Sequence, residues 1–142
     1  MRCGAHYRKP NSGTTLAKIL IIEDNAANMK LAVLLMQNAG HTALCAIDAE
    51  TGLTLARADR PQLILMDIQL PGMDGLAATR LLKSDAATAD IPIIALTSMA
   101  MKDDQAKTRV AGCDAYIAKP LRYLELYAAI DALLAQANSG VT

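Results

Sequence analysis

Short, fully apolar runs alternate along this chain with stretches in which apolar residues recur every three or four positions. Runs such as 19–22 and 63–66 are apolar throughout, which is typical of strands buried on both faces. The stretches between them are punctuated by glycine and proline, as helix ends are. The pattern predicts strands at 19–22, 42–47, 63–67, 91–96 and 114–118, and helices at 25–39, 49–58, 75–83, 100–111 and 121–135.

Strands that alternate with helices in this way predict an α/β protein whose parallel sheet is covered by helices on both faces. With five strands, the natural order is 2-1-3-4-5, that of the flavodoxin-like doubly wound fold. A chain of 142 residues is the size of one domain. We expect that domain to span 18–136, with a mobile N-terminal tail at 1–17 and a short C-terminal tail at 137–142.

Composition narrows the class of protein. The 14 basic and 14 acidic residues balance, and no basic run stands out, which argues against direct DNA binding and against a membrane surface. No apolar stretch is long enough to span a membrane, and the N-terminus lacks a signal-peptide core. Because Cys3, Cys45 and Cys113 are widely separated, we expect reduced thiols rather than disulfides or a zinc site. These features together predict a cytoplasmic protein.

Polar residues that could bind a ligand or take part in a reaction lie at the ends of the predicted strands. Glu23 and Asp24 end the first strand, Asp67 the third and Thr97 the fourth, and Lys119 follows the fifth. The carboxyl ends of parallel strands meet at one edge of the sheet, where ligands bind in such folds, so we expect these residues to converge. Carboxylates about 4 Å apart repel by roughly 4 kcal/mol per pair at an effective dielectric of 20, and a Mg²⁺ (or Mn²⁺) ion with oxygen ligands would relieve this. Asp67 could then attack a phosphoryl group.

Taken singly, each of these residues has an ordinary structural explanation. Asp24, Asn25 or Thr97 can cap a helix, and Asp67 can satisfy a turn. His41 follows a glycine that ends a predicted helix, so we place it near a helix C-terminus rather than at a ligand. Only the combination at one sheet edge indicates a function.

Four segments, 21–25, 65–75, 96–98 and 116–120, resemble the receiver domain of two-component response regulators. The resemblance covers roughly 18–136 and suggests the stand-alone receivers of the DivK and CheY kind. It implies a switch that takes a phosphoryl group from the phosphohistidine of a histidine kinase or histidine phosphotransfer protein. Such a protein is not an enzyme in the usual sense, since it catalyses only its own phosphorylation and slow dephosphorylation.

The resemblance also implies the metal site and the acceptor. Asp67 would be the phosphoacceptor, and Glu23 and Asp24 would be the acidic pair that holds magnesium together with Asp67. Gln69 would lend its backbone carbonyl to the metal. Glu23 stands where aspartate is commoner in the family, but glutamate is a known variant there, so metal binding is still expected.

Further implied roles concern the switch. Thr97 and Lys119 would bind phosphoryl oxygens, and Thr97 and Tyr116 would move inward on phosphorylation. The face formed by the fourth helix, fifth strand and fifth helix would then change partners. Met99, two residues beyond Thr97, cannot hold an attacking water, so we expect slow self-hydrolysis. The peptide bond between Lys119 and Pro120 matches one that the family often holds cis. The partner face is expected to carry Lys102, Lys107, Arg109 and Arg122.

Three alternatives stay open on the sequence. An aspartate-nucleophile phosphohydrolase usually has a second aspartate two residues after the first, where this chain has Gln69, and a cap domain. A flavin-binding protein fits the fold, but no hydroxyl-rich loop follows the first strand. A receiver fragment of a hybrid histidine kinase, or a phosphate sink, fits the same motifs as a stand-alone regulator.

Overall fold

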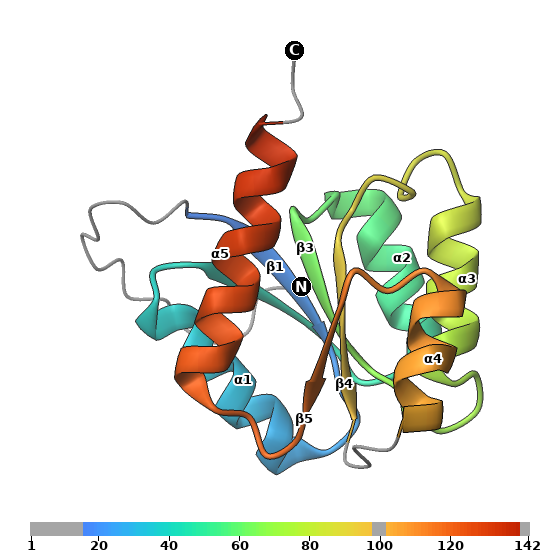
Figure 1. The fold of residues 1–142 in the computed structure, drawn as a ribbon, viewed down its shortest axis with the longest axis horizontal. Helices are drawn as coiled ribbons and strands as arrows, with labels where there is room; N and C mark the ends of the chain where they lie inside the picture. Colours follow the sequence, from blue (N-terminus) through green and yellow to red (C-terminus); the bar gives the residue numbers. More distant parts are fainter. Residues whose placement is uncertain (1–15, 98–101, 140–142) are drawn as a thin grey trace.

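The computed structural model describes residues 16–97 and 102–139, apart from the side chains of 102–105 and 137–139, and contains one parallel sheet (Figure 1). Its order is β2-β1-β3-β4-β5, which confirms the flavodoxin-like prediction. The strands are β1 Lys18–Ile22, β2 Thr42–Ala46, β3 Leu63–Asp67, β4 Ile93–Thr97 and β5 Ala115–Ala118. The helices are α1 Ala26–Asn38, α2 Ala49–Asp59, α3 Gly75–Ser84, α4 Lys102–Ala111 and α5 Tyr123–Ser139.

All the predicted elements are present, and their ends differ by a few residues. β4 begins at Ile93 rather than at residue 91, because Pro92 has no amide hydrogen to donate to the sheet. α5 continues to Ser139 instead of ending near residue 135, since no glycine interrupts it before Gly140. The predicted start of the fourth helix, with Met99, lies outside the described residues.

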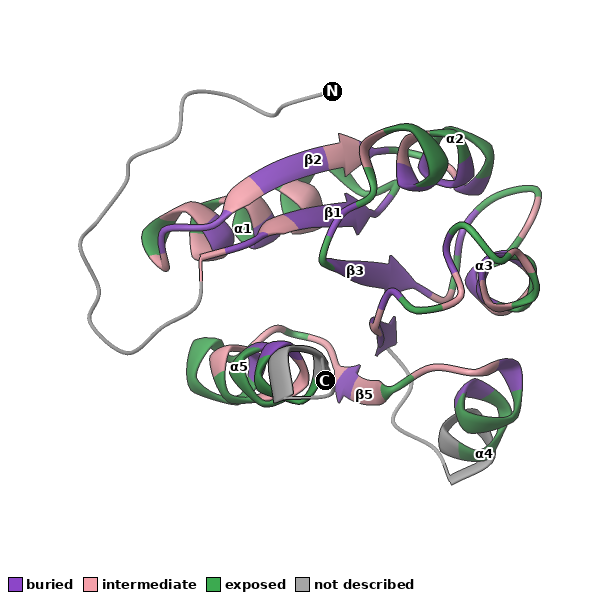
Figure 2. Ribbon diagram, turned by 90° about the horizontal axis from the view of Figure 1, so that it is seen from above, coloured by how far each residue is buried: buried purple, intermediate pink, exposed green. Residues whose placement is uncertain are grey.

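Two apolar clusters hold the helices against the sheet, because alternate side chains of a strand point to opposite faces. On one face, Ile19 and Ile21 of β1 pack with residues of α1 and α5. On the other, Leu20 and Ile22 pack with residues of α2 and α3. Figure 2 shows α1 and α5 on one side of the sheet and α2, α3 and α4 on the other. Every residue of β3 is buried, as the apolar run 63–66 predicted.

Helix caps shape the loops at the carboxyl edge of the sheet. The side chain of Asn25 accepts a hydrogen bond of 2.9 Å from the backbone N–H of Asn28 and so caps α1. Asp74 caps α3 in the same way, through the N–H of Ala77 at 2.8 Å. An N-cap side chain satisfies an otherwise unpaired N–H of the first turn. Asp24, the residue before this cap, is exposed at the sheet edge.

His41 lies just beyond the C-terminus of α1, as predicted. Gly40 has a φ of 90°, and the N–H of His41 donates to the carbonyl of Met36 at 2.9 Å, which is the bond of a Schellman ending. The buried imidazole accepts a 3.1 Å hydrogen bond at Nδ1 from the N–H of Ala17. Ala17, which the sequence placed in the N-terminal tail, is buried. Its carbonyl also accepts a 2.9 Å hydrogen bond from the N–H of Thr42, the first residue of β2.

Acid should destabilise the protein through His41. Burial lowers the pKa of the imidazole from 6.5, and the nearby Asp131 offsets only part of this. As pH falls below 6.5, the unfolded chain takes up a proton more readily than the folded protein does. The contribution of neutral His41 to the free energy of unfolding is therefore fully present above that pH and is lost as the pH falls below it. His41→Asn keeps an acceptor near the Nδ1 position but does not titrate. Urea unfolding between about pH 5 and 7 should show a steeper pH dependence for the native sequence, and parallel curves would contradict this assignment.

The cysteines depart from the prediction of three reduced thiols. Cys113 is free, but Cys45 on β2 is disulfide-bonded. The prediction is therefore wrong at Cys45. Sequence spacing could not show this, because a disulfide depends on the distance between two cysteines in the fold.

In the described part of the chain, no helix is both long and apolar enough to cross a membrane.

Candidate functional site

Four strands deliver the predicted site residues to one edge of the sheet. Asp67 is the last residue of β3 and Thr97 the last of β4. Glu23 follows β1 and continues its pairing, since its N–H donates to the carbonyl of Ala46 at 3.0 Å. The N–H of Lys119, just after β5, donates to the carbonyl of Thr97 at 2.6 Å. The peptide bond between Lys119 and Pro120 is cis, as the resemblance implied.

Glu23, Asp24 and Asp67 form an acidic cluster at this edge. One carboxylate oxygen from each lies within 4.8 Å of the others. Glu23 and Asp67 are only 2% exposed, whereas Asp24 faces solvent. An oxygen-only set that is open to water on one side suits Mg²⁺ or Mn²⁺. The residues therefore fit the predicted cation.

Asp67 is held by two neighbours besides the other carboxylates. Its Oδ1 accepts a 3.0 Å hydrogen bond from the backbone N–H of Gln69, and its Oδ2 lies 3.3 Å from the ammonium of Lys119. The side chain of Gln69 is exposed. Its carbonyl as a metal ligand stays a prediction. The aspartate is thus held in place with one oxygen within 4.8 Å of an oxygen from each of the other two carboxylates.

The electrostatics of the cluster favour a bound cation. Burial and, after it, the hydrogen-bonded carboxyl of Glu23 raise the pKa of Asp67 to about 7. The N–H of Gln69 and the charge of Lys119 act in the opposite direction but do not compensate. A second positive charge at the cluster would keep Asp67 ionised at neutral pH. An ionised carboxylate is the form that can attack phosphorus.

Lys119 makes a contact that the sequence did not predict. Its Nζ lies 2.7 Å from Oε1 of Glu23, closer than the 3.3 Å to Asp67. The other oxygen of Glu23 accepts a 3.1 Å hydrogen bond from the N–H of Asn25. Both carboxylate oxygens of Glu23 are therefore engaged within the chain.

Gly75 is a further site residue that sequence reasoning missed. It begins α3, and its N–H donates to the carbonyl of Ile68 at 2.9 Å. A Cβ added there would strike the backbone carbonyl of Asp67 and would lie 2.7 Å from Cα of Ile68. Gly75 therefore allows the start of α3 to lie very close to the end of β3. The available signal was a glycine at a helix start, just after the aspartate that caps it.

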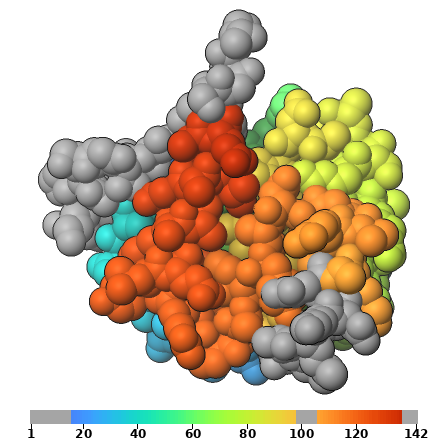
Figure 3. All heavy atoms as spheres, viewed as in Figure 1, coloured from blue at the N-terminus to red at the C-terminus, as the bar shows by residue number. Residues whose placement is uncertain are grey.

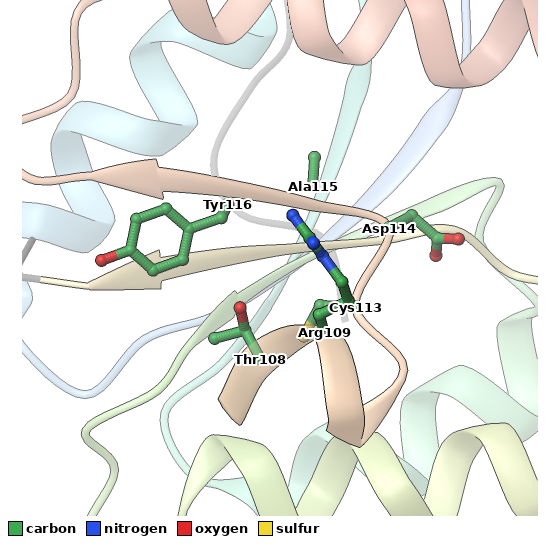
Figure 4. Close-up of a pocket in the computed structure, with 6 residues that line it drawn as sticks. All are labelled: Thr108, Arg109, Cys113, Asp114, Ala115 and Tyr116. Atoms are coloured by element: carbon green, nitrogen blue, oxygen red, sulfur yellow. The ribbon is translucent and has the colours of Figure 1, made fainter. Parts of the chain in front are cut away.

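Tyr116 lies beside α4 and is not part of the acidic cluster. In the β4–β5 register it pairs with Ala95, and Thr97 pairs with Ala118. Residues two apart on a strand point to the same face, so Thr97 and Tyr116 share the face that α4 covers. Tyr116 lines a pocket of about 150 Å³ (Figure 4), together with Thr108, Arg109, Cys113, Asp114 and Ala115.

Comparisons with known proteins point to one family. The family model of the response regulator receiver domain matches residues 19–131. The polar-differentiation response regulator DivK of Brucella anthropi is 46% identical over 110 residues, covering 75% of this chain and 89% of DivK. The receiver domain of the sensor histidine kinase PA1611 from Pseudomonas aeruginosa, solved with a magnesium ion coordinated in its active site cleft, is 30% identical with a TM-score of 0.79, covering 85% of this chain and 99% of that one. A CheY-like receiver protein from Methanospirillum hungatei is 26% identical with a TM-score of 0.81, covering 88% and 98%.

Proposed function

Because the chain belongs to the response regulator receiver family, we propose that it is a phosphorylation-controlled switch in which Asp67 accepts a phosphoryl group. The observation that carries this proposal is the burial of Asp67 against Glu23 and Asp24, with the ammonium of Lys119 3.3 Å away. The donor is a phosphohistidine on a sensor histidine kinase or a histidine phosphotransfer protein. The likeness to DivK, of which 89% is covered, favours a single-domain regulator over a receiver cut from a hybrid kinase. A phosphohydrolase is disfavoured because Gln69 replaces its acid.

The chemistry is one phosphoryl transfer. A carboxylate oxygen of Asp67 attacks the phosphorus, the P–N bond breaks, and its electron pair returns to the histidine ring of the donor. Glu23, Asp24, Asp67 and the carbonyl of Gln69 would hold a divalent cation, which would supply positive charge against the incoming phosphoryl oxygens. The hydroxyl of Thr97 and the ammonium of Lys119 bind those oxygens as a hydrogen-bond donor and a point charge.

The shared face of Thr97 and Tyr116 supports a route from the site to a partner. When Thr97 turns toward the new phosphoryl group, the space beside α4 changes, and Tyr116 moves inward. Figure 3 shows atoms of both α4 and α5 on the face of the molecule viewed there, and Figure 2 shows β5 between the two helices. Lys107 and Arg109 of α4 are exposed, as is Arg122 just before α5, whereas the side chain of Lys102 lies outside the described residues. A downstream target protein would bind this α4–β5–α5 face.

Beryllofluoride, which mimics a phosphoryl group on aspartate, tests the proposal. With Mg²⁺ it should shift amide resonances at the acidic cluster and also at Arg109 and Tyr116 in α4 and β5. Asp67→Asn should abolish all these shifts. Asp48→Asn is the matched control, because Asp48 is an N-cap outside the cluster and asparagine caps equally well. Unchanged spectra of the native sequence would rule out the switch.

The phosphorylated form should be long-lived. Met99, which lies outside the described residues, offers no hydrogen bond to position an attacking water. We therefore expect a half-life of minutes or longer after removal of acetyl phosphate, followed on gels that separate the phosphorylated protein. A half-life of seconds in the purified protein would contradict the role given to Met99.

A further inference from the structure

Glu23, which is proposed to hold the metal ion, already pairs with the ammonium group of Lys119. Oε1 of Glu23 lies 2.7 Å from Nζ of Lys119, and Oε2 accepts the N–H of Asn25 at 3.1 Å. Glu23 is 2% and Lys119 12% exposed in their side chains, so water does little to weaken the pair. A divalent ion that binds at the cluster must therefore replace at least one of the existing partners of the Glu23 carboxylate.

The contact depends on the length of two side chains. Glu23 follows β1 and Lys119 follows β5, and β3 and β4 lie between these strands. Neighbouring strands are about 4.8 Å apart, so Glu23 and Lys119 can meet only because both side chains are long. An aspartate at position 23 would withdraw the carboxylate by about 1.5 Å. That takes the 2.7 Å contact outside hydrogen-bond range.

We propose that Lys119 and the divalent cation compete for Glu23, so that cation binding releases the ammonium of Lys119 toward Asp67. The inference rests on the proposed function, because it concerns the same metal site. Its consequence is an order of events within the chain. In the metal-free protein Lys119 is held mainly by Glu23, and it becomes available to a phosphoryl group on Asp67 once the cation has taken its place.

A double-mutant cycle on Mg²⁺ affinity, measured by calorimetry, separates competition from simple repulsion between two positive charges. Lys119→Met should tighten Mg²⁺ binding about tenfold in the native background, the size expected for loss of one strong contact. In the Glu23→Asp background, where the contact is already broken, the same change should tighten it by no more than about threefold. Lys83→Met is the control, because Lys83 pairs with Asp114 at 3.1 Å outside the cluster. Equal tightening in both backgrounds would overturn the competition.

The ammonium resonance of Lys119 gives a second readout that needs no variant to be stable. Mg²⁺ alone should shift this resonance, while that of Lys83 stays in place. A Lys119 resonance that does not move at saturating Mg²⁺ would overturn the inference and leave the metal site intact. A protein that binds no Mg²⁺ in either experiment would overturn the inference and the proposed metal site together, whereas loss of the beryllofluoride response alone would affect only the phosphoacceptor role.

Discussion

Asp67→Asn should abolish phosphorylation by acetyl phosphate and, at the same time, make the metal-free protein more stable. Asparagine lacks the nucleophilic oxygen that would form the acyl phosphate. It keeps the shape of aspartate and one carbonyl oxygen to accept the N–H of Gln69, which Asp67 accepts at 3.0 Å. It also removes a buried negative charge from beside Glu23.

The sign of the stability change follows from the pKa of Asp67, which burial and Glu23 raise from 3.8 to about 7 in the folded protein. As pH rises above 3.8, the unfolded chain releases a proton that the folded protein retains, so ionisation favours unfolding until the pH passes about 7. We expect Asp67→Asn to raise the free energy of unfolding by about 1–3 kcal/mol at about pH 8 and by little at about pH 4.

Magnesium should reverse this order of stability. A ligand that binds only the folded state stabilises it, and the Asn variant has lost one of the three carboxylates of the cluster. Thermal unfolding with and without Mg²⁺ checks both effects in one experiment. Two results would contradict the view that repulsion among the carboxylates destabilises the metal-free protein and that Mg²⁺ relieves it. One is a variant less stable than the native sequence at about pH 8 without metal. The other is a variant that gains as much stability from Mg²⁺ as the native sequence does.

Gly75→Ala should be the most destabilising single-methyl addition near the site. The new Cβ would strike the carbonyl of Asp67 and would lie 2.7 Å from Cα of Ile68, and both are backbone atoms that cannot rotate away. Overpacking of this kind costs about 3 kcal/mol at the upper end of its usual range. Urea unfolding measures the loss, and Mg²⁺ affinity should fall as well because the end of β3 must shift.

Gly72→Ala is the matched control for this prediction. Gly72 lies in the same loop, but a Cβ there meets nothing within 4 Å. Its φ of 71° makes alanine cost only about 1 kcal/mol. If the two variants lose the same stability, close approach of α3 to the acceptor strand is not what Gly75 provides.

The sheet could be predicted from the sequence because strands buried on both faces appear as continuous apolar runs. The run 63–66 has no polar position, and β3 is buried throughout. The sequence also predicted which residues reach the carboxyl edge, since strand order and strand ends decide that. Asp67 at the end of β3 and Thr97 at the end of β4 required no knowledge of side-chain positions.

What the sequence could not predict depends on distances across the fold. The bond from Lys119 to Glu23 depends on the reach of two side chains over two intervening strands. The role of Gly75 depends on how closely α3 approaches β3. The hydrogen bond from Ala17 to His41 joins the start of the sheet to the end of α1, a contact that leaves no periodic pattern.

The central claim is that Asp67 is the residue that receives the phosphoryl group, and locating the modification tests it most directly. The full chain is incubated with acetyl phosphate and Mg²⁺, then treated with borohydride, which reduces an aspartyl phosphate to homoserine. Mass spectrometry of the peptides should place homoserine at position 67 and nowhere else. Homoserine at Asp24 or at another aspartate, or its absence from the whole chain, would contradict the account.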